Sequence, residues 1–348
     1  MKSEEIAKIA GVSRSTVSRV INNYTNVPEE TKNKVLEVIE KYNYQPNTCA
    51  RVLAGKKNDT IGLFIVSTAD SENPNRLYNN NYFTQFVNAI VECANSMGYY
   101  VLINIIYCEN DYNRVSEVFL QKRIDGGIVI GTEHEAEVLI NVSRNGCPIA
   151  LIDYDEEDIR INKSDNDNLI VVGSKDYEGA VSAIEYLIEL GHKDIGLLSG
   201  RLSTFSGKQR YKAFFDTMSK HGLEVNEDFI LYGDFIKSKT ISEVTRLINS
   251  GNLPTALFSS NDDMAITAIK LFKENNIKVP EDISIIGFDN IPLSSLIKPA
   301  LTTISTPVIN IVEKTVRELI LNINKNKKGF TSYSYDTKMI IRETCSKK

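Results

Sequence analysis

The sequence predicts an α/β protein with two doubly wound parallel-sheet subdomains, preceded by a small all-α helix-turn-helix domain. From Thr60 onward, continuous apolar runs alternate with amphipathic stretches, which is the pattern of buried parallel strands and the helices that cover them. Residues 1–57 show only helix-like apolar spacing. The 348 residues are enough for a small first domain and two sheets.

Composition excludes several classes of protein. The chain is 42% hydrophobic and 24% charged, so wholesale disorder is excluded. No apolar run reaches about 18 residues, so we expect neither a transmembrane helix nor a membrane partner. Residues 1–10 carry charged side chains and lack the apolar core of a signal peptide, so we expect the chain to stay in the cytoplasm.

Charge is distributed unevenly along the chain. Residues 1–57 hold 7 Lys and 3 Arg against 6 acidic residues, a net charge of +4, within a chain whose total is −5. A basic head on an acidic body is expected where one part alone contacts a polyanion. An accidental excess of solvated lysines would give the same figure, so charge alone does not decide.

Cofactor and metal motifs are missing from the sequence. The five cysteines are scattered and form no CxxC or Cys/His cluster, so we expect neither a metal site nor a disulfide framework. No GxGxxG or Walker A sequence occurs, so we expect no nucleotide cofactor. His192 follows a helix-exit pattern, Leu190-Gly191, and is expected to pair with a helix C-terminus rather than to act as a base.

Residues 1–57 are predicted to form four short helices. Ser3 is expected to cap the first helix and Ser13 the second, with a turn at Gly11 between them. Pro28 opens a third. The predicted inner faces carry Ile6, Ile9 and Ala10, then Val17, Val20 and Ile21, then Val35, Leu36, Val38 and Ile39.

Four segments of this region, taken in order, resemble the head of the LacI/GalR family of transcriptional repressors. They are Ile6-Ala7-Lys8-Ile9-Ala10-Gly11-Val12-Ser13, then Thr16 to Asn22, Tyr44 to Asn47 and Leu53-Ala54-Gly55. The resemblance implies that double-stranded DNA, a pseudo-palindromic operator, is the partner. It implies that Arg14, Ser15 and Arg19 face the bases from the major groove. It assigns phosphate or positioning contacts to Thr16, Ser18, Asn22, Tyr44 and Asn47. For Arg19, a surface salt bridge is the alternative.

The same resemblance divides the chain into residues 1–46 as the DNA-binding domain, 47–58 as hinge helix and linker, and 59–348 as a two-lobed core. In the hinge, Ala50 and Leu53 are implied DNA contacts, with Leu53 as the apolar wedge in the minor groove. Leu53 could instead pack within a linker. The first lobe is expected near 59–172 plus 306–332, and the second near 173–305 plus 333–345.

Polar residues follow several predicted strands of the core. In open α/β sheets, ligands bind at the carboxyl ends of strands. Asp153, Asn261, Asp262 and Asp289 occupy such positions. Carboxylates accept hydrogen bonds from pairs of sugar hydroxyls, and an Arg fork donates to hydroxyl and ring oxygens. These residue types suit hydroxyl recognition, although scattered carboxylates could also serve hydrolysis.

The core, with segments such as Ser260-Asn261-Asp262 and Gly287-Phe288-Asp289-Asn290, also resembles this family, whose core is similar to periplasmic sugar-binding proteins. The resemblance places a small-molecule effector, most often a sugar, in a cleft between the lobes. The implied effector contacts are Tyr82, Phe83, Asp153, Arg210, Phe235, Asn261 and Asp289. Asp153 matches the pattern less well, and Phe83 could instead be a core residue of its helix.

The expected function is therefore an effector-responsive transcriptional regulator, a repressor of a carbohydrate-utilisation operon, and not an enzyme. A ligand-binding protein or a small-molecule enzyme on the same core is the alternative, as is a nucleobase effector. We expect a homodimer because no leucine-heptad tail follows the last strand-like run. Residues 67–81 form a longer, Asn-rich loop than the family pattern, which could cap a ligand, touch a partner or remain a flexible surface loop.

Overall fold

The computed structural model describes residues 1–21, 24–44, 57–67, 80–108, 111–131, 137–157, 168–325 and 329–348. The chain divides into two compact units, Met1–Asn58 and Asp59–Lys348. No helix within these described ranges is long and apolar enough to cross a membrane. The long loop predicted at 67–81 and residues 47–56 of the predicted hinge fall almost entirely outside the described residues.

The first unit contains α1 (Ser3–Ala10), α2 (Arg14–Ile21) and α3 (Glu29–Lys41). Ile6, Val17 and Val35, one from each helix, are fully buried and form the centre of its core. α1 ends at Gly11, whose φ of 67° lies in the left-handed region that glycine adopts without strain. This small core holds α2 against the other two helices.

The helix starts and faces differ in three places from the prediction. Ser13 caps α2 as predicted, because the Thr16 N–H donates to the Ser13 hydroxyl at 3.1 Å. The prediction that Ser3 caps α1 is wrong: Ser3 is its first residue, and the Glu5 carboxylate accepts from the Lys2 N–H at 2.7 Å. Ile9 is 47% exposed and Leu36 is 43% exposed, so their placement on the inner faces of α1 and α3 is also wrong.

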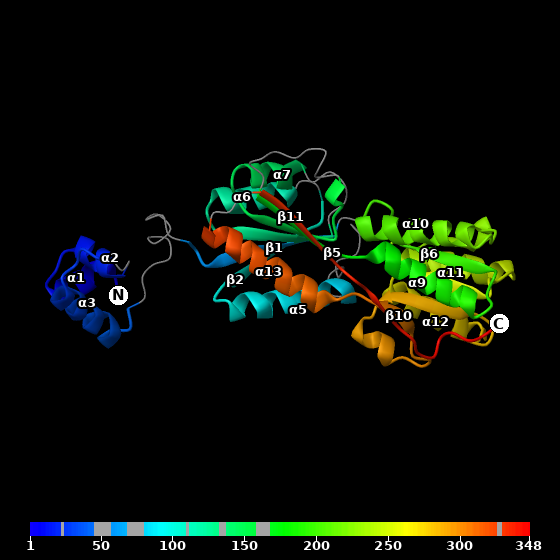
Figure 1. The fold of residues 1–348 in the computed structure, drawn as a ribbon. Coiled ribbons are helices and arrows are strands. Elements are labelled where there is room, and N and C mark those ends of the chain that lie inside the picture. The colour runs from blue at the N-terminus through cyan, green and yellow to red at the C-terminus, as the bar shows by residue number, and fades with distance from the viewer. Residues whose placement is uncertain are drawn as a thin grey trace. The chain divides into compact units, whose positions relative to one another are not determined.

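The first lobe of the second unit is a parallel sheet with the strand order β11-β5-β4-β3-β1-β2. α5 and α13 pack on one face of this sheet, and α6 and α7 pack on the other (Figure 1). The elements are β1 (Thr60–Val66), α5 (Asn81–Ser96), β2 (Tyr100–Ile106), α6 (Tyr112–Leu120), β3 (Gly126–Ile130), α7 (Glu137–Arg144), β4 (Ile149–Ile152), β5 (Asn168–Ser174), α13 (Val308–Lys325) and β11 (Gly329–Tyr335).

The second lobe is a sheet with the order β12-β10-β9-β8-β6-β7, in which β12 alone among the described strands runs antiparallel. α9 and α10 cover one face, and α11 and α12 cover the other. The elements are α9 (Asp176–Glu189), β6 (Ile195–Ser199), α10 (Phe205–Lys220), η2 (Glu227–Phe229), β7 (Ile230–Tyr232), α11 (Lys237–Ser250), β8 (Ala256–Ser259), α12 (Asp262–Glu274), β9 (Ser284–Asp289), η3 (Pro292–Ser295), β10 (Thr302–Ser305) and β12 (Lys338–Ile340).

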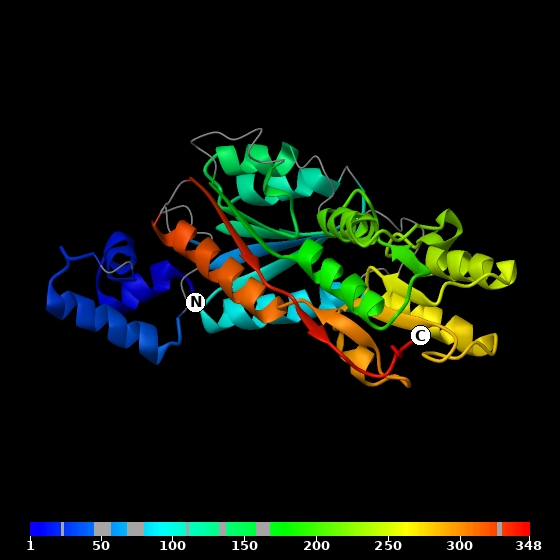
Figure 2. The same ribbon diagram turned by 45° about the vertical axis from the view of Figure 1, so that its right-hand side comes forward.

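The chain passes between the two sheets after β5, after β10 and after β11 (Figures 1 and 2). The first and third crossovers are tied together: Lys175 Nζ lies 2.7 Å from Asp336 Oδ1, and the Lys175 N–H donates to the Tyr335 carbonyl at 2.8 Å. β11 continues to Tyr335, so the third crossover lies slightly beyond the position near 332 that the sequence suggested. These two crossovers lie next to each other and form part of the connection between the two lobes.

His192 plays a different part from the one predicted. It is 3% exposed, with Nδ1 3.0 Å from the Thr255 hydroxyl and Nε2 3.0 Å from the Ser346 carbonyl. Burial lowers its pKa, so the ring stays neutral and is not a charged partner of a helix end. The carbonyl of Leu190 instead accepts from the Lys348 N–H at 3.0 Å. His192 therefore anchors the C-terminal segment to the second lobe.

Candidate functional site

α2 presents a polar face to solvent on the first unit. Arg14, Ser15, Ser18 and Arg19 are exposed, while the intervening Val17 is buried. Within the described residues Arg19 makes no ion pair, so the salt-bridge alternative finds no support there. Arg14 lies 3.3 Å from Glu4, but both side chains are about two-thirds exposed (67% and 68%), and such a pair contributes little stability and exchanges easily. The helix therefore offers forked and hydroxylic donors on one side.

Hydroxyl groups gather at the start of α2. The Ser13 hydroxyl lies 2.7 Å from that of Ser15 and 2.9 Å from that of Thr16. A helix N-terminus with hydroxyl donors favours anionic oxygens such as phosphates. The polar face and this cluster together suit contact with a nucleic acid backbone and bases.

Tyr44 lies in the core of the first unit rather than on its surface. Its side chain is 9% exposed and packs in the same cluster as Val20 and Val35. In the structure Tyr44 thus stabilises the three-helix unit. The other implied contacts Asn22, Asn47, Ala50 and Leu53 lie outside the described residues.

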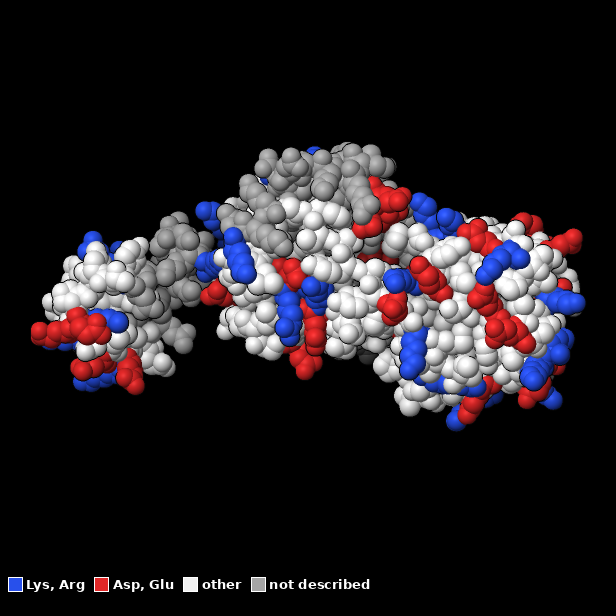
Figure 3. Space-filling model, viewed as in Figure 1, with Lys and Arg blue, Asp and Glu red and all other residues white. Residues whose placement is uncertain are grey.

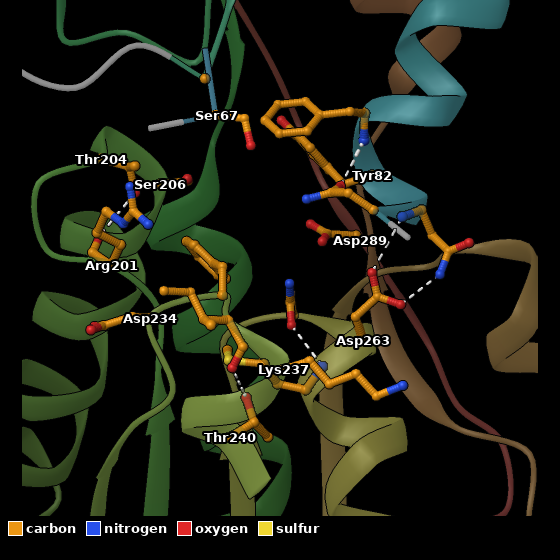
Figure 4. A pocket seen from close by; sticks show the side chains of 18 of the residues that line it. Ser67, Tyr82, Arg201, Thr204, Ser206, Asp234, Lys237, Thr240, Asp263 and Asp289 are labelled. Carbon is orange, nitrogen blue, oxygen red and sulfur yellow. Dashed lines mark hydrogen bonds between the residues drawn. The ribbon is translucent and has the colours of Figure 1, made fainter. Parts of the chain in front are cut away.

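The face of the second unit seen in Figure 3 carries interspersed Lys/Arg and Asp/Glu side chains rather than one basic patch. The second unit contains a cavity of about 440 Å³, and polar and aromatic residues of both lobes line it (Figure 4). The lining includes the ends of several parallel strands: Val66 at the end of β1 and Ser67 after it, Gly131 after β3, Asp153 after β4, Asn261 after β8 and Asp289 at the end of β9. All seven predicted effector contacts line this cavity: Tyr82, Phe83, Asp153, Arg210, Phe235, Asn261 and Asp289.

Arg210, on α10, is the buried centre of the site, with 3% of its surface exposed. Its Nε and Nη2 donate to Asp176 Oδ2 at 3.0 and 2.8 Å, and Nη2 also donates to Asp289 Oδ1 at 3.1 Å. Nη1 donates to the Ser260 carbonyl at 2.5 Å, and the guanidinium carbon lies 3.7 Å from the centre of the Phe288 ring. This planar fork is therefore held in one orientation before a ligand arrives.

More carboxylates than cations surround this arginine. Burial, together with repulsion from Asp176, raises the pKa of Asp153 to about 6. Burial also raises the pKa of Asp289 well above its usual value, against the opposing effect of Arg210. Asp153 and Asp289 both have positive φ, 60° and 104°, which is uncommon for a residue with a side chain. Surplus oxygen acceptors along the cavity wall favour a ligand that brings hydroxyl or amide donors.

Asp153 lies at the boundary between the lobes. It follows β4 of the first lobe and accepts hydrogen bonds from the hydroxyl and the backbone N–H of Ser206, in the first turn of α10 in the second lobe. A carboxylate at a helix N-terminus is stabilised by the helix dipole. The lobes therefore meet through a carboxylate that also faces the cavity.

The Asn261-Asp262-Asp263 segment at the start of α12 divides its side chains between the cavity and the interior. Asn261 Oδ1 accepts from the Met264 N–H at 2.9 Å and caps α12. Asp262, which the sequence offered as a ligand contact, is fully buried and does not line the cavity. It accepts from the Ile291 N–H at 2.9 Å and from the Ser294 hydroxyl at 2.5 Å. Its neighbour Asp263 faces the cavity instead.

Aromatic rings form part of the cavity wall. Tyr82 and Phe83 come from the first turn of α5, with ring centres 5.7 Å apart, and Phe235 follows β7 in the second lobe. Gly131 allows the approach of Phe83, because a Cβ at that position would lie 2.8 Å from its ring. Flat apolar faces on two lobes suit the face of a ring-shaped ligand.

Sequence reasoning missed two residues that shape the site. Asp176 holds Arg210, although it does not line the cavity, and Asp263 lines the cavity and contacts α5. The position of Asp176, two residues beyond the end of β5, could have revealed it, since acids at strand ends were the signal that identified Asp153 and Asp289. Within the described part of the chain, no cluster of three His, Cys, Asp or Glu residues is placed to hold a metal.

Comparisons with known proteins agree with both units. Residues 4–47 match the family model described as bacterial regulatory proteins, lacI family, and residues 184–345 match a periplasmic binding protein-like domain. The chain is 32% identical over 347 residues to the HTH-type transcriptional repressor PurR of Pasteurella multocida, covering 98% of this chain and 97% of that protein. It is 30% identical over 342 residues to the probable HTH-type transcriptional repressor ExuR of Bacillus subtilis, with the same coverage, 98% and 97%.

Solved structures show the same architecture. The Lac repressor dimer bound to operator and the anti-inducer ONPF matches with a TM-score of 0.82 and 26% identity, covering 99% of both chains. The CelR–cellobiose complex has the same fold, with a TM-score of 0.73, 21% identity and 99% coverage of both chains. The polar helix α2, the two-lobed core and these relatives lead to one conclusion: the chain belongs to the LacI family of bacterial regulatory proteins and is a DNA-binding transcriptional repressor, not an enzyme.

Proposed function

We propose that a small polyhydroxylated molecule of the sugar class binds in the cavity of this repressor and changes its affinity for the operator. The observation that carries the proposal is the orientation of Arg210, which Asp176, Asp289 and the Ser260 carbonyl hold beside the cavity. A guanidinium fork next to surplus carboxylate acceptors can bind neighbouring hydroxyls, which donate to the carboxylates and accept from the fork.

The other lining residues fit the same ligand. Asp153 and Asp289 supply acceptors, and Asn261, whose carbonyl oxygen is engaged as a helix cap, retains its amide nitrogen as a donor. Tyr82, Phe83 and Phe235 supply flat surfaces for the ring of a sugar. Residues of both lobes would therefore contact the ligand, and its binding would stabilise the closed cleft.

A nucleobase is the second candidate for this cavity. The aromatic side chains would stack on a planar base, and the Asp and Asn side chains could pair with its edge. The chain also aligns over nearly its full length with repressors named PurR. The two ligand classes differ in their need for Asp289, because a sugar uses its carboxylate as a hydroxyl acceptor whereas a base can obtain most of its binding energy from stacking.

A thermal-shift screen tests the proposal. Monosaccharides, disaccharides, sugar acids and purine bases are each added to the full chain and to the Asp289→Ala variant. We expect a sugar to raise the melting temperature of the wild type and to leave that of the variant unchanged. A shift given only by a purine, retained in the variant, would replace the sugar with a base. A gel shift on the repressor's own upstream DNA then shows whether the ligand changes operator affinity.

On the DNA side, we propose that α2 enters the major groove with Arg14, Ser15 and Arg19 at the base edges. Thr16 and Ser18 then bind phosphates, and Tyr44 supports the unit from its core. The exposed polar face of α2 supports this orientation. From the family resemblance we add Asn22, Asn47, Ala50 and Leu53 as DNA contacts, within a chain organised as head 1–46, hinge 47–58 and core 59–348.

We propose further that the repressor is a homodimer whose first lobes meet at β2. This strand lies at the edge of its sheet, with Tyr100, Leu102 and Ile103 exposed by 74%, 37% and 42%, and the exposed Met97 precedes it. A row of apolar side chains on an edge strand favours a protein partner over water. A second copy fits because a pseudo-palindromic operator requires two heads, and a dimeric Lac repressor shares this architecture.

A further inference from the structure

A hydrogen-bonded bridge crosses the cavity mouth at the start of α5. Asn81 Nδ2 donates to Asp263 Oδ1 at 2.6 Å, and the Asn81 backbone N–H donates to Asp263 Oδ2 at 3.4 Å. Figure 4 shows the Asp263 carboxylate turned toward α5, with both bonds drawn. Asn81 belongs to the first lobe and Asp263 to the second, 182 positions apart in the chain, so opening of the cleft separates them.

The start of α5 shows why a carboxylate fits here. The first backbone N–H groups of a helix have no partner within the helix. Asn80 caps α5 by accepting from the Phe83 N–H at 3.0 Å, which leaves the Asn81 N–H for another acceptor. Asp263 provides that acceptor from the opposite lobe and also lies at the positive end of the α5 dipole. The bridge is thus a second cap, supplied across the cleft.

The other groups near Asp263 do not replace this contact. Burial raises the pKa of Asp263, and the hydrogen bonds from Asn81 oppose that effect more strongly than the charge of Lys237. Lys237 is exposed at the start of α11. Within the described residues, no ion pair joins Lys237 to Asp263. Asn81 is therefore the principal partner of this carboxylate.

We infer that Asp263 is a positioning residue that seats the start of α5, and with it Tyr82 and Phe83, over the cavity and holds the unliganded cleft closed. Both aromatic residues follow Asn81 directly, so a shift at Asn81 moves the aromatic wall. The consequence of this positioning for effector binding rests on the proposed function of the cavity. The hydrogen-bonded bridge itself requires no ligand. A test without ligand therefore separates failure of this inference from failure of the proposed function.

Hydrogen–deuterium exchange of the full chain tests the inference with the variants Asp263→Ala, Asn81→Ala and the double variant. In Asp263→Ala we expect amides of residues 80–87, in the opposite lobe, to exchange about tenfold faster, since a charge-assisted bond is lost. The double variant should show no further acceleration, because both substitutions remove one interaction. Glu274→Ala is the matched control: it removes a carboxylate from the far end of the same helix, paired with the exposed Lys270 at 3.7 Å.

Two results would overturn the inference. One is unchanged exchange over 80–87 in Asp263→Ala, which would show that the carboxylate does not hold α5. The other is a double variant in which the two accelerations multiply, which would show that the residues act independently. A merely structural defect of α12 would appear in its own amides and not across the cleft. Should Asp263→Ala fold poorly, Asp263→Asn, which keeps the size but loses the charge, supports the same comparison.

Discussion

Asp262 and Asp263 are neighbours with opposite surroundings. Asp262 points into the protein, where Ile291, Ser294 and Thr303 donate to it, and so fixes the segment that follows Asp289. Asp263 faces the cavity and reaches the other lobe. Consecutive positions on a helix point about 100° apart, so one acid can support the site while the next one forms its rim.

The burial of Asp262 predicts a pH effect on stability. Burial raises its pKa to about 7 in the folded protein, against a usual value of 3.8. Between these values the folded state holds a proton that the unfolded state lacks. The contribution of Asp262 to the free energy of unfolding is therefore greatest below pH about 4. It falls by up to about 1.4 kcal/mol per pH unit until pH about 7. Above that pH the contribution stays constant.

Urea unfolding at several pH values between 4.5 and 8 checks this prediction. We expect Asp262→Asn to remove that part of the pH dependence, so that the stability difference between wild type and variant is larger at pH 5 than at pH 7.5. Glu274→Gln, an exposed acid on the same helix, should leave the pH profile unchanged. Parallel profiles for wild type and Asp262→Asn would show that Asp262 is ionised in the folded state.

Arg19 carries a prediction about DNA reading. We expect Arg19→Ala to weaken binding to the operator by roughly 10- to 100-fold, the usual effect of losing a bidentate contact to guanine, with a smaller loss on unrelated DNA. Fluorescence anisotropy with both DNAs at two salt concentrations measures the ratio. Lys34→Ala removes the same charge from α3, where Lys34 pairs with Glu30 at 2.8 Å, and should lower both affinities equally or not at all. Equal losses for Arg19→Ala would assign it to a phosphate.

Individual site residues were predictable where the rule was local. Asp153, Asn261 and Asp289 follow buried strands, and such positions meet at one edge of a sheet. The choice between Asp262 and Asp263 was not predictable, because it depends on the rotation of α12 against its sheet. The partnership of Arg210 with Asp176 was also hidden, since it joins residues 34 positions apart in different helices.

At the scale of elements, the buried strands of both sheets were the easiest to predict. β1, β3, β4, β6, β8 and β9 are short apolar runs, and the structure places them inside their sheets. α13 was not predicted, although nine of its residues are buried along one face. β11, with the sequence GFTSYSY, alternates polar and aromatic residues and was missed because its place beside β5 depends on a partner over 150 residues away.

The exposed edge strand β2 leads to a prediction about assembly. We expect Ile103→Glu to convert the dimer to a monomer at micromolar concentration, because a charge placed in an apolar interface must be desolvated. Sedimentation equilibrium measures the change, and operator affinity should fall with it. Leu120→Glu is the control, since Leu120 is 80% exposed at the end of α6 and lies outside β2. A dimer that survives Ile103→Glu would place the interface elsewhere.

For the whole molecule, the proposed coupling between effector and operator binding has to act equally in both directions. If the ligand found by thermal shift changes operator affinity by a given factor, operator DNA must change the ligand's affinity by the same factor, commonly 5- to 150-fold. Isothermal titration calorimetry of the ligand, with and without operator DNA, measures the second of these factors. We expect equal factors, and a ligand that binds with the same affinity with and without operator would show that the cavity and the DNA-binding surface are not coupled.

The three crossovers also affect how the repressor is made. β11 and β12, within the last twenty residues, supply the outer strands beside β5 and β10. Until these residues leave the ribosome, β5 and β10 each lack the neighbouring strand on one side. Neither sheet can therefore be completed from the segments that are synthesised earlier. Pairings between distant segments form slowly, and open strand edges invite association with other nascent chains. A chain that ended before Gly329 would thus lack both of these edge strands of the core while keeping an intact head.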